Sequence, residues 1–131
     1  MANPNIVNVV SIVGGPAAWA LTTTLTTTLL TVGADVIVKI NSIICTNIHG
    51  TNAAALSLEI NGIAAGATGA VATNHLTTQV RIASTINVPA DDVLVVIDKP
   101  IYMMEGYILR GGASAASVLE LFASFEVIND A

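Results

Sequence analysis

Residues 76–88 read LTTQVRIASTINV, and this stretch decides between a helical and a β-sheet protein. Its apolar side chains recur two or four residues apart, with polar side chains between them. In an extended strand, one face would carry Leu76, Val80, Ile82, Ile86 and Val88. Arg81 then lies on the opposite face, whereas a helix would place it beside the apolar side chains. The alternation therefore predicts a half-buried β-strand.

The same alternation appears in three other segments, residues 36–48, 54–61 and 118–128. In the first of these, VIVKINSIICTNI, we expect one uninterrupted register. Its predicted apolar face comprises Val36, Val38, Ile40, Ile44 and Ile48, and its polar face comprises Lys39, Asn41 and Asn47. In residues 54–61 we expect Ala54, Leu56, Leu58 and Ile60 to face the core. In residues 118–128 we expect Leu119, Leu121, Ala123, Phe125 and Val127 to do so.

Shorter apolar runs and turn signals complete the pattern. The short runs occupy residues 5–13, 93–97 and 101–109. Glycine, proline and Asp clusters predict turns at 14–16, 33–35, 61–62, 89–92 and 111–112. Short alternating strands with turns every 8–14 residues are typical of an all-β sandwich or barrel. The alanine- and glycine-rich residues 63–74 are predicted to form a long loop, with a small helical insert as the alternative.

Residues 21–30, LTTTLTTTLL, are ambiguous in their spacing, because Leu21, Leu25 and Leu29 would share a face of either a helix or a strand. The six threonines favour a strand, since they are stiff at χ1 and poor in helices. The strand would carry an uncharged polar face made of Thr22, Thr24, Thr26 and Thr28. Such a face is compatible with both water and a neighbouring subunit.

The composition indicates a single domain with a surface that favours assembly. The chain has 131 residues, 53% of them hydrophobic and only 10% charged. Soluble domains usually carry about 25% charged residues, so a surface this poor in charge invites association. The alternative is a monomer made soluble by its many Thr, Asn and Ser residues.

Charge and cysteine content exclude several classes of function. The net charge is −5, and the four cations, Lys39, Arg81, Lys99 and Arg110, are spread through the chain. Nucleic-acid binding and charge-driven membrane binding both need clustered Lys and Arg. Because these cations are not clustered, we expect neither function. We expect neither a signal peptide nor an apolar span long enough to cross a membrane. The single Cys45 cannot form an intrachain disulfide, and we expect it to be buried as a small apolar residue, for example under a neighbouring subunit.

No constellation of residues predicts a reaction. His49 and His75 stand alone outside any catalytic motif, and Asp91-Asp92 look like turn residues. No calcium-loop spacing is present. We therefore expect a protein that is not an enzyme and that uses no cofactor or metal.

The end of the chain carries a family resemblance. Residues 99–128 read KPIYMMEGYILRGGASAASVLELFASFEVI. This segment resembles the closing region of small virion structural proteins of tailed bacteriophages. The matching positions are Pro100, Ile101, Tyr102, Glu105, Gly106, Leu109, Ala113 and Glu126. Tyr107 departs from the pattern, because an Asp often follows the Gly in that family, and an aromatic residue at this turn suggests packing against a partner.

The resemblance implies an antiparallel β-sandwich, jelly-roll-like with about eight strands, that repeats many times on a particle. Capsid decoration (cement) proteins, neck proteins and tail or fibre modules all fit this description. Among them we expect a capsid decoration protein in the virion, made in the host cytoplasm, that contacts itself, with a trimer favoured, and the major capsid protein. A tail, neck or fibre module that binds host glycans is the alternative. We expect residues 1–20 to form an N-terminal strand or arm, either exchanged between subunits or ordinary within its own sandwich, and residues 21–131 to form the sandwich. The candidate interface residues are Trp19, Thr22, Thr24, Thr26, Thr28, Tyr102 and Tyr107.

Overall fold

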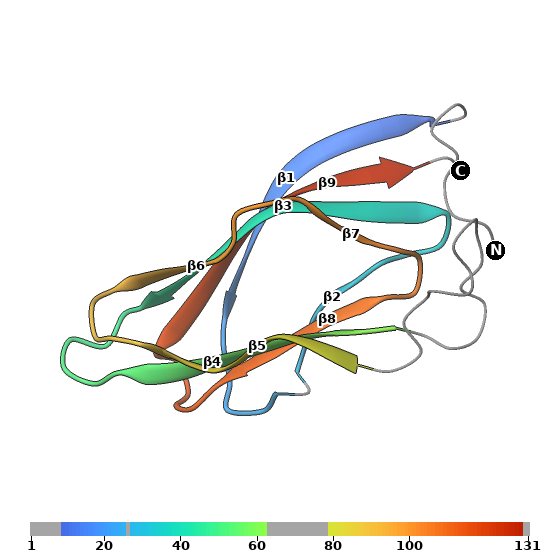
Figure 1. Cartoon of the computed structure of the whole chain (residues 1–131). Coiled ribbons are helices and arrows are strands. Elements are labelled where there is room, and N and C mark those ends of the chain that lie inside the picture. Colours follow the sequence, from blue (N-terminus) through green and yellow to red (C-terminus); the bar gives the residue numbers. More distant parts are fainter. Residues whose placement is uncertain (1–8, 26, 63–78, 130–131) are drawn as a thin grey trace.

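The computed structural model describes residues 9–25, 27–62 and 79–129, which form two antiparallel β-sheets packed face to face and contain no helix (Figure 1). Sheet A consists of β1 (Ser11–Ala20), β9 (Leu119–Asn129), β3 (Val36–Asn47), β6 (Val93–Ile97) and β7 (Ile101–Met103). Sheet B consists of β2 (Thr28–Thr31), β8 (Ile108–Ala113), β4 (Ala54–Asn61) and β5 (Gln79–Val88). The predicted all-β sandwich is confirmed.

The strand order is that of a jelly roll. Sheet A runs β1-β9-β3-β6 and sheet B runs β2-β8-β4-β5. β7 pairs with the first half of β3 and β6 with the second half, so together they fill one strand position. Eight strand positions in two four-position sheets, with most connections crossing between them, define this architecture. It corresponds to the predicted count of about eight strands.

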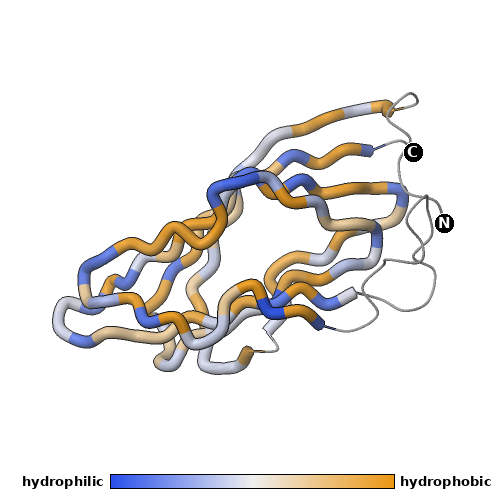
Figure 2. The backbone as a smooth tube through the Cα atoms, viewed as in Figure 1, coloured by the Kyte–Doolittle hydropathy of each residue, from blue (hydrophilic) through white to orange (hydrophobic). Residues whose placement is uncertain are grey.

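The core lies between the two sheets. Sheet B contributes Leu56, Leu58 and Leu109, and sheet A contributes Ile40, Ile43, Leu119 and Leu121, all of them buried. The predicted inward faces of residues 54–61 and 118–128 are confirmed, because Ala54, Leu56, Leu58, Ile60, Leu119, Leu121 and Ala123 are buried, and Phe125 and Val127 pack against them. Apolar residues nevertheless occur along nearly every strand of the tube in Figure 2, including strands at the sheet edges.

The predicted register of residues 36–48 is correct only in its first half. Val38 and Ile40 are buried, but the pairing of β3 with β9 shifts between Ile40 and Ser42. A bulge inserts one extra residue, so every side chain beyond it changes face. The buried positions then become Ile43, Cys45 and Asn47, whereas Ile44 is half-buried and Ile48 is exposed.

The strand predicted over residues 76–88 is confirmed for Gln79–Val88, and residues 76–78 lie outside the described residues. Its pairing with β4 shifts register twice, and Thr85 has a positive φ of 49°. Ala83 is therefore buried, and Ile82 is half-buried and packs against the core. Val80 and Ile86 are exposed, whereas Val88 is buried. These exposures are physically reasonable because β5 lies at the edge of sheet B.

Two predicted turns are in fact strand residues. Gly14, Gly15 and Pro16 lie within β1, which pairs with β9 of its own chain along all ten residues. Gly111 and Gly112 lie within β8. A Cβ at Gly112 would come within 2.9 Å of the backbone of Thr24 and Leu25, so a close approach of another segment, not a turn, requires glycine there.

The prediction of a strand over residues 21–30 is wrong for residues 21–25 and 27, and Thr26 lies outside the described residues. Only the end of the stretch is extended, as part of β2, and the described residues 21–25 and 27 form the crossing from sheet A to sheet B. Backbone N–H groups of Ala113 and Gly111 donate to the carbonyls of Thr22 and Thr27 at 2.8 and 3.2 Å. The loop thus runs along β8 without joining its ladder.

Candidate interaction surface

The outer face of sheet A carries an apolar row that crosses four strands. The pairing registers place Ala18 of β1, Phe122 of β9, Ile44 of β3 and Val95 of β6 side by side. Directly opposite residues point to the same face of a sheet, and this face is turned away from the core. Phe122 is 46% exposed and Val95 58% exposed. We call these four residues the outer row.

A shallow pocket adjoins the outer row. It has a volume of about 280 Å³ and is lined by Ala18, Trp19, Ala20, Thr46, Glu120, Leu121 and Phe122. Ala20, Glu120 and Thr46 form the next row of the same outer face, and this row ends at the exposed Val93. Small alanine side chains on β1 leave the space, and Phe122 and Glu120 border it with an aromatic ring and a carboxylate.

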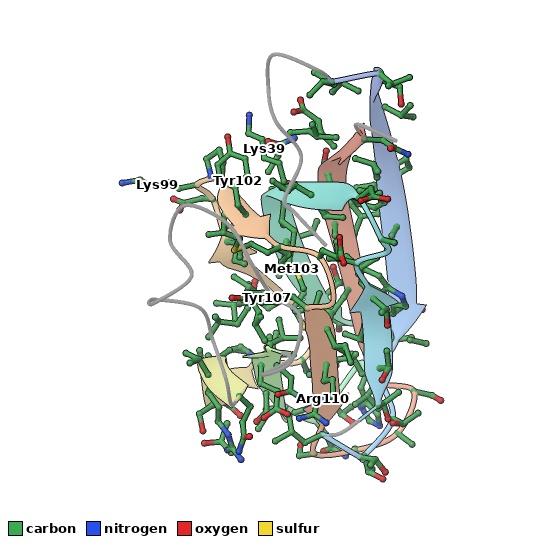
Figure 3. All side chains as sticks on the ribbon, turned by 90° about the vertical axis from the view of Figure 1, so that its right-hand side faces the viewer. Lys39, Lys99, Tyr102, Met103, Tyr107 and Arg110 are labelled. Atoms are coloured by element: carbon green, nitrogen blue, oxygen red, sulfur yellow. The ribbon has the colours of Figure 1, made fainter. Side chains whose placement is uncertain are left out.

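Farther along the same face, the surface is charged and then apolar again. Lys39 Nζ lies 3.7 Å from Glu126 Oε2. Because both side chains are partly exposed, this ion pair contributes little to the stability of the fold. Tyr102 of β7 is paired with Lys39 and is exposed; Figure 3 shows the two together with Lys99 at one side of the molecule. Beyond them, Ile12, Ile128 and Ile37 form a second outward row.

The outer face of sheet B has a different, ionic character. Glu59 of β4 is paired with Arg81 of β5 and with Arg110 of β8. Its side chain is only 4% exposed, Arg110 Nη2 lies 2.7 Å from Oε1, and Arg81 Nε lies 4.0 Å from Oε2. Within the described residues, Arg110 Nε is buried without a hydrogen-bond partner. This cluster engages two of the chain's four cations in neutralising one buried carboxylate.

The structure places two of the predicted interface residues, Trp19 and Tyr102, on sheet A, but it buries a third, Tyr107. Trp19 is half-buried, packs against the core and borders the pocket, while Tyr102 lies exposed on the same sheet. Tyr107 is buried between the sheets, so its ring packs in the chain's own core and presents no surface to a partner here. Figure 3 shows it beside Met103 in the interior.

The threonine face predicted from residues 22–28 does not form a flat array. Thr22, Thr24 and Thr28 are exposed, and Thr26 lies outside the described residues. Thr22 Oγ1 lies 2.8 Å from Thr27 Oγ1 and accepts from the backbone N–H of Thr24 at 3.3 Å. These hydroxyls therefore stabilise their own loop, and the threonines are not aligned along one strand.

The contacts of His49 and Cys45, two residues considered for catalysis, serve the fold. His49 Nδ1 accepts from the backbone N–H groups of Thr51 and Asn52 at 3.2 and 3.1 Å, which closes a turn. Cys45 is fully buried in its own chain, and burial raises the pKa of its thiol to about 11. His75 and residues 63–74 lie outside the described residues. No group of three metal-ligating side chains occurs in the part of the chain that the structure describes, and no helix there is long and apolar enough to cross a membrane.

Sequence reasoning missed the outer row, although a signal for it was present. Residues 93–97 read VLVVI, which is apolar on both faces of a strand. Leu94 and Val96 pack against the core, and Val93 and Val95 point outward. Ile44 was expected inside because nothing in the sequence marks the bulge in β3.

The fold and the surface together define a jelly-roll β-sandwich with an apolar outer face. Comparisons with protein-family models, with curated proteins and with solved structures found no match to this chain. Since one fold supports many functions, the function rests on the surface and on the residues that form it.

Proposed function

We propose that the protein is a non-enzymatic structural component of a bacteriophage particle, and specifically a capsid decoration (cement) protein. The outer row carries this proposal, because Phe122 and Val95 expose large apolar side chains on the outer face of sheet A. Contiguous apolar patches on soluble domains mark interaction sites. The virion assignment is supported by the resemblance of residues 99–128 to small phage structural proteins, and the jelly roll is an architecture that viral capsid proteins use.

The mechanism would be burial of the outer row against neighbouring capsid subunits. Each apolar contact contributes about 25 cal/mol per Å² before the costs of association. A single contact of this size is weak, but many copies on one particle act together through a high effective concentration. The scarcity of charge on the chain is consistent with a surface largely covered in the assembly.

A second candidate function is a tail, neck or fibre module that binds host glycans, and the pocket favours it. Phe122 offers an aromatic face to a sugar ring, and Glu120 and Thr46 offer hydrogen-bonding groups beside it. Specific binding on a glycan array that is lost in Glu120→Ala would favour this function over cement. Absence of such binding would favour cement.

The test of the virion role is the copy number of the protein in purified particles, measured by quantitative mass spectrometry. Hundreds of copies per particle support a capsid role, and a dozen or fewer support the neck or tail. Absence from particles would contradict both. Phe122→Lys and Val95→Lys should release the protein from the particle, whereas Val80→Lys should not. Val80 is the matched control because it is as exposed as Phe122, at 46%, but lies on sheet B.

A further inference from the structure

The free edge of β1 differs from the other sheet edges among the described residues. β2 has four residues, β6 has five and β7 has three, and the pairings of β2 and β6 contain register shifts. β5 is longer but contains two shifts and the positive φ of Thr85. Short or bulged edges resist pairing with other chains. β1, in contrast, runs for ten residues in unbroken register with β9.

The hydrogen bonds between β1 and β9 show which backbone groups of β1 point to its free edge. Leu21 N–H donates to the Leu119 carbonyl at 2.9 Å, in the same register as the β1–β9 ladder. Bonding direction alternates along an antiparallel strand, so even-numbered residues of β1 direct their backbone groups to the free edge. Pro16 occupies one of these positions, has no N–H, and limits pairing at that point.

Within the described residues, Ile12 and Gly14 are therefore the backbone donors in the first half of β1 that face the free edge. Val10, the preceding even-numbered residue, already donates its N–H to the Asn129 carbonyl at 2.8 Å. The part of the edge that a partner strand can pair with therefore runs from Ile12 to Gly14, where the register with β9 is unbroken, and is bounded by Val10 and Pro16. A partner strand must fit its own donors and acceptors to Ile12 and Gly14.

The side chains beside this edge are apolar and uncharged. Ile12 is 62% exposed and Val13 60% exposed, although Val13 points to the core side of the sheet. Figure 1 shows why, since the first half of β1 rises at the top of sheet A, away from sheet B. No residue from 1 to 34 carries a charge, so identical strands can lie opposite each other without repulsion between like charges.

We infer that two copies of the chain pair antiparallel through the free edges of β1, with the twofold axis at Val13. In this register, Ile12 and Gly14 of one copy exchange hydrogen bonds with Gly14 and Ile12 of the other. Val13 lies opposite Val13 of the partner subunit, and each Ile12 packs over a glycine. Gly14 leaves space for it, because a Cβ there would meet only the Phe125 carbonyl oxygen, at 4.0 Å. Pro16 would lie opposite Val10, so the two residues that cannot donate fall together.

This inference deepens the proposed function, on which its biological role rests, by naming the contact between copies. It predicts a twofold dimer, whereas the expectation from the sequence was a trimer. The outer row stays free in the dimer and remains available to other virion proteins. Loss of particle binding in Val95→Lys therefore tests the virion role without touching the β1 edge.

Disulfide trapping tests the pairing in the full-length chain. Opposed residues of a non-hydrogen-bonded pair have Cα atoms about 4.5 Å apart, within the range that a disulfide spans. Val13→Cys should therefore form a covalent dimer rapidly under mild oxidation. Ala18→Cys is the matched control, since it is exposed on the same strand but would lie roughly 34 Å from its counterpart, at about 3.4 Å per residue. The native Cys45 is buried and does not compete.

A Val13→Cys dimer that forms at least tenfold faster than the Ala18→Cys dimer supports the pairing, and equal rates would overturn it. A second variant needs no oxidation: Ile12→Lys should convert the dimer to a monomer in light scattering, while Val95→Lys leaves the dimer intact. An Ile12→Lys protein that remains as dimeric as the wild type would also overturn the inference. If Val13→Cys cross-links but the protein is absent from particles, the pairing stands and the virion role fails.

Discussion

At the scale of single residues, Asn47 shows what alternation along the sequence could not reveal. Its buried amide donates to the carbonyls of Asn52 and Val88 at 3.0 and 2.9 Å and accepts from the backbone N–H of His49 at 2.9 Å. A buried polar side chain is tolerated when its hydrogen bonds are satisfied. The sequence placed Asn47 outside, because the partners that permit its burial come from other segments.

The ionic cluster around Glu59 leads to a first prediction. Glu59→Ala should destabilise the protein by about 2–4 kcal/mol, because it leaves Arg110 partly buried without its carboxylate. Urea unfolding measures the change. Glu126→Ala is the matched control, since its ion pair with Lys39 is partly exposed and should contribute less than about 1 kcal/mol. Equal effects of the two substitutions would show that Glu59 is not neutralised as described.

The single cysteine leads to a second prediction. Burial raises the pKa of the Cys45 thiol from 9.0 to about 11, so the folded protein should resist a thiol reagent at about pH 8 and react only after unfolding. The unfolded chain releases this proton near pH 9 and the folded chain near 11. The free energy of unfolding should therefore fall as the pH rises through this interval.

The control for the thiol experiment is Val95→Cys in a Cys45→Ala background, which places the thiol on the exposed outer row. This variant should react at once without denaturant. Rapid labelling of native Cys45 would mean that the thiol is accessible and that the second half of β3 faces the other way.

At the scale of elements, the strands could be predicted from alternation, but their bulges could not. The faces of β4 and β9 follow their sequences, since their alternation is unbroken. The bulge in β3 reverses the face of Ile44 and Cys45, and it depends on the fit to β9. Residues 21–25 and 27 look like a strand by propensity, but backbone hydrogen bonds from β8 to Thr22 and Thr27 override that preference.

Hydrogen exchange on β1 provides the prediction at this scale. In the monomer, amides at Val13, Gly15 and Trp19 should exchange slowly because they face β9, whereas those at Ile12 and Gly14 should exchange quickly. Raising the protein concentration should protect Ile12 and Gly14 as the edges pair. Ala18 and Ala20 serve as internal controls, because they point to the same edge beyond Pro16 and should stay fast. Slow exchange of all even-numbered amides in the monomer would contradict the bonding direction.

At the scale of the whole molecule, composition indicated an assembling protein but not the surface responsible. Alternation along single strands was sufficient for the sandwich, because it records which face each strand buries. The outer row depends on which strands are neighbours, since Ala18, Phe122, Ile44 and Val95 come from four separate strands. That information lies in the topology, so the candidate residues chosen from sequence favoured the threonine face and Tyr107 instead.

The central claim is that these exposed apolar surfaces make the chain a subunit of an assembly. Size-exclusion chromatography with light scattering on the purified wild-type chain, over a series of concentrations, tests this most directly. We predict a mass of twice the 13.4 kDa of one chain or more, rising with concentration. A stable 13.4 kDa monomer that stays soluble at high concentration would contradict the account.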